Sequence, residues 1–119
     1  MTPELQRLVQ EAQTTGTLAG LPNYHFIDGA AVASADGGTM ETLDPGTGRV
    51  FARFAAGQAS DVDLAVQAAN RALKGSWRDM SPAQRGRVLH RIAELIRANA
   101  ARLAVVETLD SGKRLVEAL

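Results

Sequence analysis

The sequence predicts a mixed fold of helices and strands, dominated by one long amphipathic helix near the C-terminus. Three observations predict this fold class. Apolar residues recur with helical spacing across Ser81–Lys113 and again across Ser60–Lys74, and short β-forming runs occupy residues 24–54. The chain has 119 residues, which fits one modest domain.

The first residues predict a short helical arm. Thr2 is suited to cap a helix, and Pro3 is suited to its first position, where a missing N–H costs nothing. One apolar face follows, formed by Leu5, Leu8, Val9 and Ala12. Residues 14–22 are small and polar with two glycines, which is typical of a linker. We therefore expect residues 1–23 to form a peripheral arm and linker.

The middle of the chain predicts short strands. Asp28-Gly29 lies between the apolar runs of Tyr24–Val32, and this dipeptide is the strongest short-range signal for a hairpin. A short strand at Met40–Leu43 should end at the turn-forming cluster of residues 44–48. A further strand is expected over Arg49–Phe54, closed by Gly57.

Two helices follow, and the second is the safest prediction. Ser60 is expected to cap the helix over Ser60–Lys74, with Asp63 completing a capping box. The long helix begins with a second capping box, Ser81 with Gln84, and Gly112 provides its stop. Its apolar arc consists of Val88, Leu89, Ile92, Leu95, Ile96, Leu103 and Val106. A helix of this kind needs apolar partners along its whole face.

The chain ends on a pattern that predicts an incomplete domain. Arg114–Leu119 begins a new helical pattern of only one or two turns, which is too short to be stable alone. The few short strands likewise leave open edges and an uncovered face. We therefore expect apolar surfaces that are covered by protein outside this chain.

Composition excludes several function classes. The chain contains no cysteine, so it offers neither a thiol nucleophile nor a thiolate metal ligand. His25 and His90 are isolated, which argues against a histidine metal site, and no phosphate-binding or dinucleotide-binding glycine motif is present. Net charge is zero and no apolar run is long enough to span a membrane, so we expect a soluble, cytoplasmic protein that binds neither nucleic acid nor membrane.

The arginines of the long helix leave one alternative open. Arg85, Arg87, Arg91, Arg97 and Arg102 form a locally basic surface. This surface could contact phosphate or nucleic acid, or it could be a solvated face with ion pairs such as Arg91 with Glu94. We favour the solvated face, because no aromatic residues alternate with the arginines. The residues alone thus predict no catalytic and no cofactor-binding side chain.

A series of short motifs resembles the N-terminal part of the aldehyde dehydrogenase superfamily. In chain order they are Phe26-Ile27-Asp28-Gly29, residues 41–50 (ETLDPGTGRV), Gly57 with residues 61–66 (DVDLAV), Trp77-Arg78, residues 81–87 (SPAQRGR) and residues 107–113 (ETLDSGK). The order and spacing of the set make it specific. The arm and the SPAQR helix start are most similar to members that act on γ-aminobutyraldehyde-type substrates.

The resemblance implies an α/β fold. Residues 24–119 would be the N-terminal strands and first helices of a Rossmann-like cofactor-binding domain, in a protein several times longer. Family members are oxidoreductases, commonly homo-oligomers, that oxidise a small aldehyde to a carboxylic acid with NAD or NADP through a cysteine thioester. The catalytic cysteine and glutamate of the family lie beyond Leu119, so this chain alone is expected to be inactive and to bind no cofactor.

The resemblance also implies a partial site for Na⁺ or K⁺. In many members a main-chain carbonyl from the strand end and the carboxylate of ETLD bind a monovalent cation, which corresponds here to Leu43 (or Thr42) and Asp110. Glu107 and Asp110 share one face near the C-terminus of the long helix, where negative charge is unfavourable. A bound cation would offset the charge of Asp110.

Two hypotheses from different classes therefore remain. In the first, the chain is an inactive N-terminal fragment whose partner is the remainder of the enzyme or a complementing chain. In the second, the chain is a non-catalytic subunit or interaction module that docks through exposed apolar faces.

Overall fold

A computed structural model describes residues 1–119, which form two compact units. Both units are built from segments that are distant in the sequence. The first unit consists of Met1–Pro22, Glu41–Arg53 and Ala93–Leu119, and the second of Asn23–Met40 and Phe54–Ile92. The N-terminal arm therefore packs with the C-terminal end of the chain.

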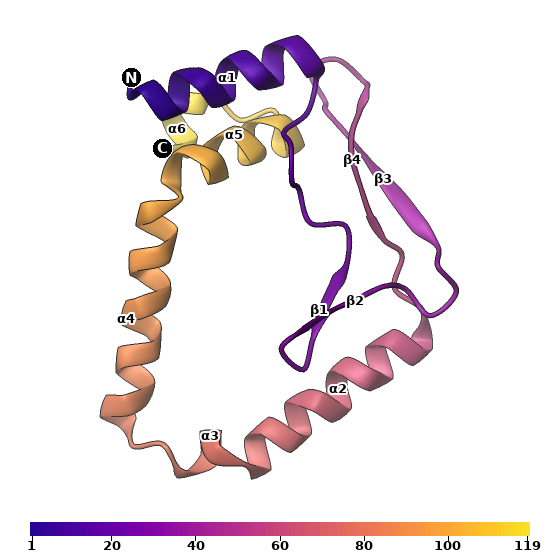
Figure 1. The fold of residues 1–119 in the computed structure, drawn as a ribbon, viewed down its shortest axis with the longest axis vertical. Coiled ribbons are helices and arrows are strands. Elements are labelled where there is room, and N and C mark those ends of the chain that lie inside the picture. The colour runs from indigo at the N-terminus through magenta and orange to yellow at the C-terminus, as the bar shows by residue number, and fades with distance from the viewer. The chain divides into compact units, whose positions relative to one another are not determined.

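The first unit contains three whole helices (Figure 1): α1 (Pro3–Thr15), α5 (Ala100–Ser111) and α6 (Leu115–Ala118). Thr2 caps α1 as expected, with its Oγ1 accepting a hydrogen bond from the N–H of Leu5 at 3.2 Å. Helix α5 packs against both α1 and α6. The short α6 therefore gains from α5 the support that its own length cannot provide.

The apolar core of the first unit lies between α1 and α5. Leu8 is its most deeply buried large side chain, with 1% of its surface exposed. The buried cluster is Leu5, Leu8, Leu18 and Val105. Val9, Ala12, Leu21, Ala101, Val106, Leu109 and Leu115 pack against it from the sides. The apolar face predicted for the arm is thus the face that it buries.

A two-stranded sheet joins β3 (Thr39–Leu43) to β4 (Val50–Ala55), close to the strands expected from the sequence. The turn between them is closed by hydrogen bonds from the N–H groups of Thr47 and Gly48 to the carbonyl of Asp44. Thr17 Oγ1 donates to the carbonyl of Phe51, which attaches β4 to the segment after α1.

The second unit begins with the predicted hairpin. Strands β1 (His25–Ile27) and β2 (Ala30–Val32) pair antiparallel, with Ile27 opposite Ala30. Asp28 and Gly29 have φ values of 53° and 78°, which are the positive values that a two-residue turn of this kind requires. Arg71 on α2 (Ala59–Lys74) pairs with Asp28 at 2.9 Å, which attaches the turn to the helix.

The cap of α2 differs from the sequence-based expectation. The capping residue is Gln58 rather than Ser60, and the box partner is Asp61 rather than Asp63. Asp61 Oδ2 accepts a hydrogen bond from the N–H of Gln58 at 2.8 Å, and this contact starts the helix one residue before Ser60. A one-turn helix, α3 (Ser76–Asp79), follows α2.

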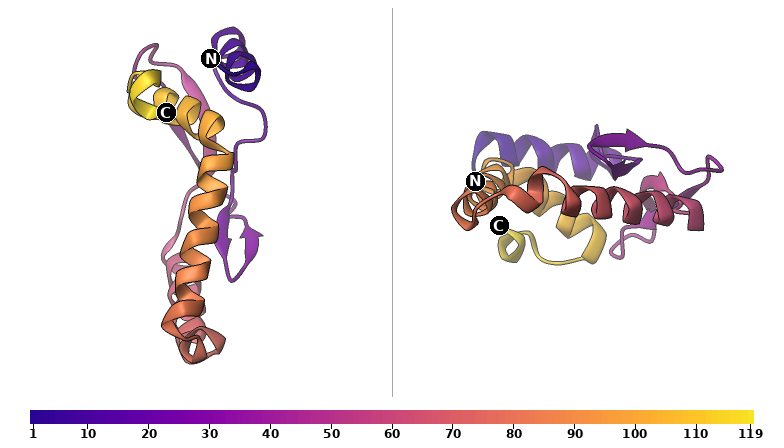
Figure 2. Two further views of the ribbon diagram at one scale, coloured as in Figure 1. Left: turned by 90° about the vertical axis from the view of Figure 1, so that its left-hand side faces the viewer. Right: turned by 90° about the horizontal axis from the view of Figure 1, so that it is seen from below.

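The single long helix predicted over Ser81–Lys113 is wrong, because it is two helices, α4 (Pro82–Ala98) and α5. Asn99, with φ −108° and ψ 14°, separates them as the N-cap of α5, and Figures 1 and 2 draw two distinct helices. Both the main-chain N–H and the side-chain Nδ2 of Asn99 donate to the carbonyl of Leu95, and this local competition favours a helix end. The predicted start at Ser81 with Gln84 and the stop at Gly112 are confirmed.

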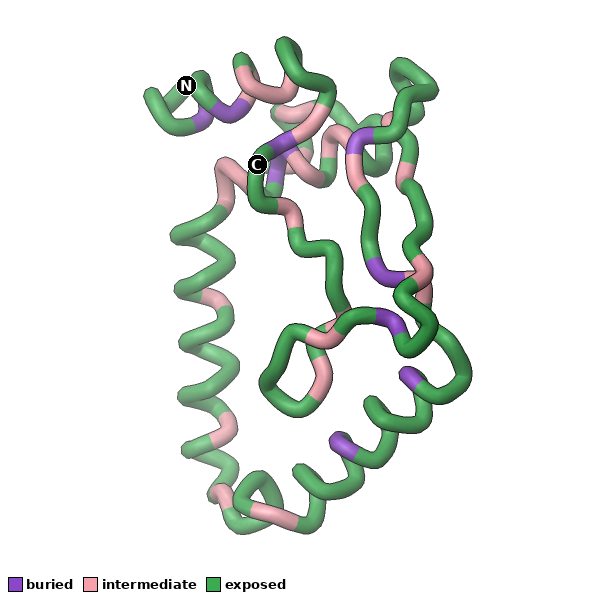
Figure 3. The backbone as a smooth tube through the Cα atoms, turned by 45° about the vertical axis from the view of Figure 1, so that its right-hand side comes forward, coloured by how far each residue is buried: buried purple, intermediate pink, exposed green.

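The apolar arc of α4 is not covered by this chain. No residue of α4 is buried, as Figure 3 shows along its length. Leu89 exposes 66% of its surface and Ile96 exposes 54%. Large apolar side chains are also exposed on α2, among them Val62, Val66 and Leu73. None of the helices has the combination of length and apolar character that crossing a bilayer would need.

Candidate functional site

The first candidate site joins the end of β3 to the last turn of α5. Thr42 Oγ1 donates a hydrogen bond to Asp110 Oδ1 at 2.9 Å, across 68 positions of sequence. Close by, a Cβ built on Gly112 would lie 3.0 Å from Pro45 Cγ, so the end of the helix and the turn after Leu43 are in contact. The structure thus brings together the two segments that, by the family resemblance, are expected to share a cation.

The chemistry of this pair suits a hard cation only in part. Asp110 is exposed and lies in the last turn of α5, where the helix dipole disfavours a carboxylate. A main-chain carbonyl at Leu43 would add a second oxygen of the type that such ions prefer. Nowhere does the chain gather three histidine, cysteine or acidic side chains around a metal position. Further ligands would have to come from outside this chain.

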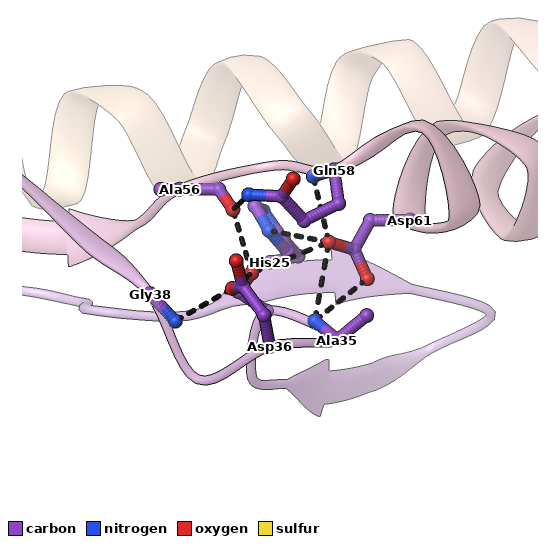
Figure 4. Close-up of polar contacts among 8 residues, drawn as sticks. His25, Ala35, Asp36, Gly38, Ala56, Gln58 and Asp61 are labelled. Carbon is purple, nitrogen blue, oxygen red and sulfur yellow. Dashed lines mark hydrogen bonds and ion pairs between the residues drawn. The ribbon is translucent and has the colours of Figure 1, made fainter.

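The second candidate site is a polar cluster at the N-terminus of α2 (Figure 4), and Asp61 is its centre. The Asp61 side chain is 4% exposed. Its oxygens accept hydrogen bonds from the N–H of Gln58 at 2.8 Å and from the N–H of Ala35 at 3.1 and 3.2 Å. These donors, led by Gln58 and assisted by the charge of His25 and the hydroxyl of Ser34, hold the pKa of Asp61 below its ordinary value.

One hydroxyl faces three acceptors in this cluster. Ser34 Oγ lies 2.6 Å from the carbonyl of Ala56, 2.8 Å from Asp36 Oδ1 and 3.4 Å from Asp61 Oδ2. The N–H of Gly38 donates to Asp36 at 2.7 Å, and this bond is the main reason that the pKa of Asp36 is lowered. The cluster therefore ties the loop after β2 to the start of α2.

His25 does not form part of a catalytic group in this cluster. His25 Nε2 is buried without a hydrogen-bond partner, 3.9 Å from Asp61 Oδ2, and the ring lies against Gly57. Because every donor to Asp61 other than Ser34 is a main-chain N–H, the cluster is a capping device rather than an acid–base pair. Sequence reasoning placed the capping carboxylate at Asp63. The sequence signal that could have identified the correct cap is the three-residue spacing of Gln58 and Asp61 at the helix start.

Comparison with known proteins identifies the family. Residues 32–119 match the family model described as "Aldehyde dehydrogenase family", which is most of the chain. The chain therefore belongs to the aldehyde dehydrogenase family, as its motifs indicated. Its mixed helix-and-strand fold is the fold of the N-terminal part of those enzymes.

Individual relatives cover most of this chain but little of their own length. A 2-hydroxymuconic semialdehyde dehydrogenase from Pseudomonas sp. (strain CF600) is 47% identical over 89 residues, 75% of this chain and 18% of that enzyme. The structure of γ-glutamyl-γ-aminobutyraldehyde dehydrogenase from Burkholderia cenocepacia J2315 is 35% identical, with a TM-score of 0.85 over 96% of this chain and 22% of that one.

A second similar structure carries a cofactor. It is PnpE in complex with nicotinamide adenine dinucleotide, 38% identical, with a TM-score of 0.78 over 82% of this chain and 20% of that one. The chain thus spans about a fifth of the length of the relatives that it matches.

Proposed function

We propose that this chain is the N-terminal part of the cofactor-binding domain of an NAD(P)-dependent aldehyde dehydrogenase. In the proposed whole enzyme, a cysteine thiolate attacks the aldehyde carbon, hydride leaves to NAD⁺ or NADP⁺, and water hydrolyses the thioester to a carboxylic acid. Residues 1–23 would be an arm and linker, and residues 24–119 the first part of the domain. We propose in addition that the whole enzyme acts on a small aldehyde, assembles as a homo-oligomer and is cytoplasmic.

The uncovered apolar arc of α4 is the observation that supports this role best. A helix that exposes Leu89, Ile92 and Ile96 in water forgoes most of the stabilisation available from burying them. Relatives that match this chain over about a fifth of their length have the remaining protein with which such a face can be covered. The role proposed for the chain is therefore that of a scaffold for a catalytic part supplied by other sequence.

The chain by itself is proposed to be inactive. It contains no cysteine, so no thioester can form on it. The test is an assay of the purified chain with NAD⁺ or NADP⁺ and an aldehyde, beside the same chain co-expressed with the remaining part of a related enzyme. We expect NADH or NADPH formation only in the second sample. Turnover by the chain alone would overturn the proposal, and so would failure to restore activity despite a stable complex.

The end of β3 and the last turn of α5 are proposed to contribute to a Na⁺ or K⁺ site. Leu43 would supply its main-chain carbonyl and Asp110 its carboxylate. The support is the hydrogen bond from Thr42 to Asp110, which holds the two segments side by side. Occupancy would reduce the unfavourable interaction of Asp110 with the C-terminus of α5.

A second candidate function is a non-catalytic subunit that docks through the same exposed faces. It is favoured by the amount of apolar surface on α2 and α4. Size-exclusion chromatography with circular dichroism separates the two cases. A discrete oligomer that melts cooperatively supports the docking subunit, whereas aggregation or non-cooperative melting supports a segment that needs the rest of its enzyme.

A further inference from the structure

The first unit contains a cavity of about 490 Å³, which is large enough for a small organic ligand. It lies among α1, the turn after β3, the start of β4, α5 and α6. Part of its wall is aliphatic, formed by Val9, Ala12, Val50, Val105, Leu109 and Leu115. The rest of the lining is glycine or polar, including Gln13, Thr14, Thr15 and Thr47. We propose that this cavity binds an aliphatic carboxylate, with the tail against the aliphatic wall and the head at Arg49 and Thr108.

Two side chains at the cavity wall are hydrogen-bond donors without partners. Thr108 Oγ1 is buried and makes no hydrogen bond, although a helical threonine commonly bonds to the carbonyl four residues earlier. The guanidinium of Arg49 forms no ion pair with any residue of the chain. A ligand carboxylate has acceptor atoms for both, and a guanidinium binds a carboxylate more strongly than it binds a neutral acceptor.

Asp44 also lines the cavity, and its charge opposes an anionic ligand. Its two oxygens already accept hydrogen bonds, from the N–H of Gly46 at 2.8 Å and from Thr47 Oγ1 at 2.8 Å. These bonds, led by that of Thr47, lower the pKa of Asp44 and satisfy the carboxylate within its own turn. Asp44 thus stays ionised but has its hydrogen bonds within its own turn, whereas the donors of Arg49 are free to bind the head of an anionic ligand.

This site is separate from the proposed dehydrogenase function, because none of its residues is assigned to catalysis. The test is isothermal titration calorimetry of the 119-residue chain with sodium decanoate below its micelle concentration, and with 1-decanol as a neutral ligand of equal length. We expect one site per chain and at least tenfold weaker binding of decanol. Failure of the dehydrogenase proposal would leave these expectations unchanged.

Four variants test the head contacts, and circular dichroism checks that each is folded. Arg49→Gln should weaken decanoate binding about tenfold, and Thr108→Val about threefold to tenfold. Arg49→Lys keeps the charge and should bind within about threefold of the wild type. The matched control is Arg53→Gln, four residues further along on β4. Arg53 lies outside the cavity and is paired with Glu41, so this variant should bind normally.

Three results would overturn the proposal. They are no binding of decanoate, equal binding of decanoate and decanol, and binding that Arg49→Gln leaves unchanged. Several weak sites per chain, insensitive to both Arg49→Gln and Thr108→Val, would mean that decanoate covers the exposed apolar faces instead. If Arg49→Gln fails to fold, the comparison of Thr108→Val with Arg53→Gln decides the outcome.

Discussion

Asp61 accepts hydrogen bonds from the N–H of Ala35 on both carboxylate oxygens, at 3.1 and 3.2 Å, although the two residues are 26 positions apart. The second unit buries few apolar side chains, of which Ala55 and Ala68 are examples. We therefore expect this polar contact to contribute a large part of the stability of the second unit.

We expect Asp61→Asn to loosen the second unit. Asparagine has nearly the same shape, but it has no charge and only one oxygen to accept from Ala35 and Gln58. Urea unfolding followed by the fluorescence of Trp77, the only tryptophan, should show a lower midpoint. Asp63→Asn is the matched control, because Asp63 is exposed two residues further along α2. Equal midpoints for the two variants would contradict the role given to Asp61.

Stability should also fall in acid because of the same carboxylate. The folded-state pKa of Asp61 is below its ordinary value, so the folded state binds fewer protons than the unfolded state. Its contribution is therefore complete above the ordinary aspartate pKa of about 4 and is lost as the pH falls through the lower folded value. The midpoint of urea unfolding should decrease below about pH 4, and less steeply in Asp61→Asn. Parallel pH profiles would show that other groups dominate.

Truncating Leu8 in the core of the first unit should strongly lower the stability of the chain. Leu8→Ala should cost about 2–5 kcal/mol, because the side chain is 1% exposed and its removal leaves a cavity between α1 and α5. Hydrogen exchange of the α1 and α5 amides would report the loss. Leu73→Ala, at a leucine that is 61% exposed, should change the free energy of unfolding by less than about 0.5 kcal/mol.

Two glycines should respond oppositely to alanine. Gly29 has a φ of 78° in the hairpin turn, so Gly29→Ala should destabilise the chain by about 1–2 kcal/mol. Gly86 lies in α4 with no atom within 4 Å of an added Cβ, so Gly86→Ala should stabilise it by about 0.5–1 kcal/mol. Thermal melting of both variants measures the difference. The same sign for both would contradict the turn geometry.

The proposed cation site predicts an ion-specific effect on stability. In the complex of this chain with the remaining part of a related enzyme, replacing tetramethylammonium with Na⁺ or K⁺ at constant ionic strength should raise the melting temperature, and Asp110→Asn should abolish the difference. Thr42→Val should lower stability by about 0.5–1.5 kcal/mol through the lost hydrogen bond, while keeping the response to the cation. If the wild type responds equally to all three cations, this chain does not hold the site.

Local sequence patterns were sufficient to predict most of the secondary structure and to indicate the family. Features that depend on contacts within a few residues can be predicted from the sequence. They are the hairpin at Asp28-Gly29, the cap at Thr2, the capping box of Ser81 with Gln84 and the helix stop at Gly112. The pairing of Leu43 with Asp110 was also proposed from the sequence, but only through the family resemblance.

The tertiary structure alone decided the remaining features. Helical periodicity cannot show the break at Asn99, because asparagine occurs both within helices and at their ends. Its backbone conformation, with φ −108° and ψ 14°, shows that a helix ends there. The choice of Asp61 over Asp63 depends on the N–H of Ala35, which the fold brings from a distant loop. The cavity at Arg49 and Thr108 likewise exists only because α1, β4 and α5 meet there, and no pattern within one segment encodes such a meeting.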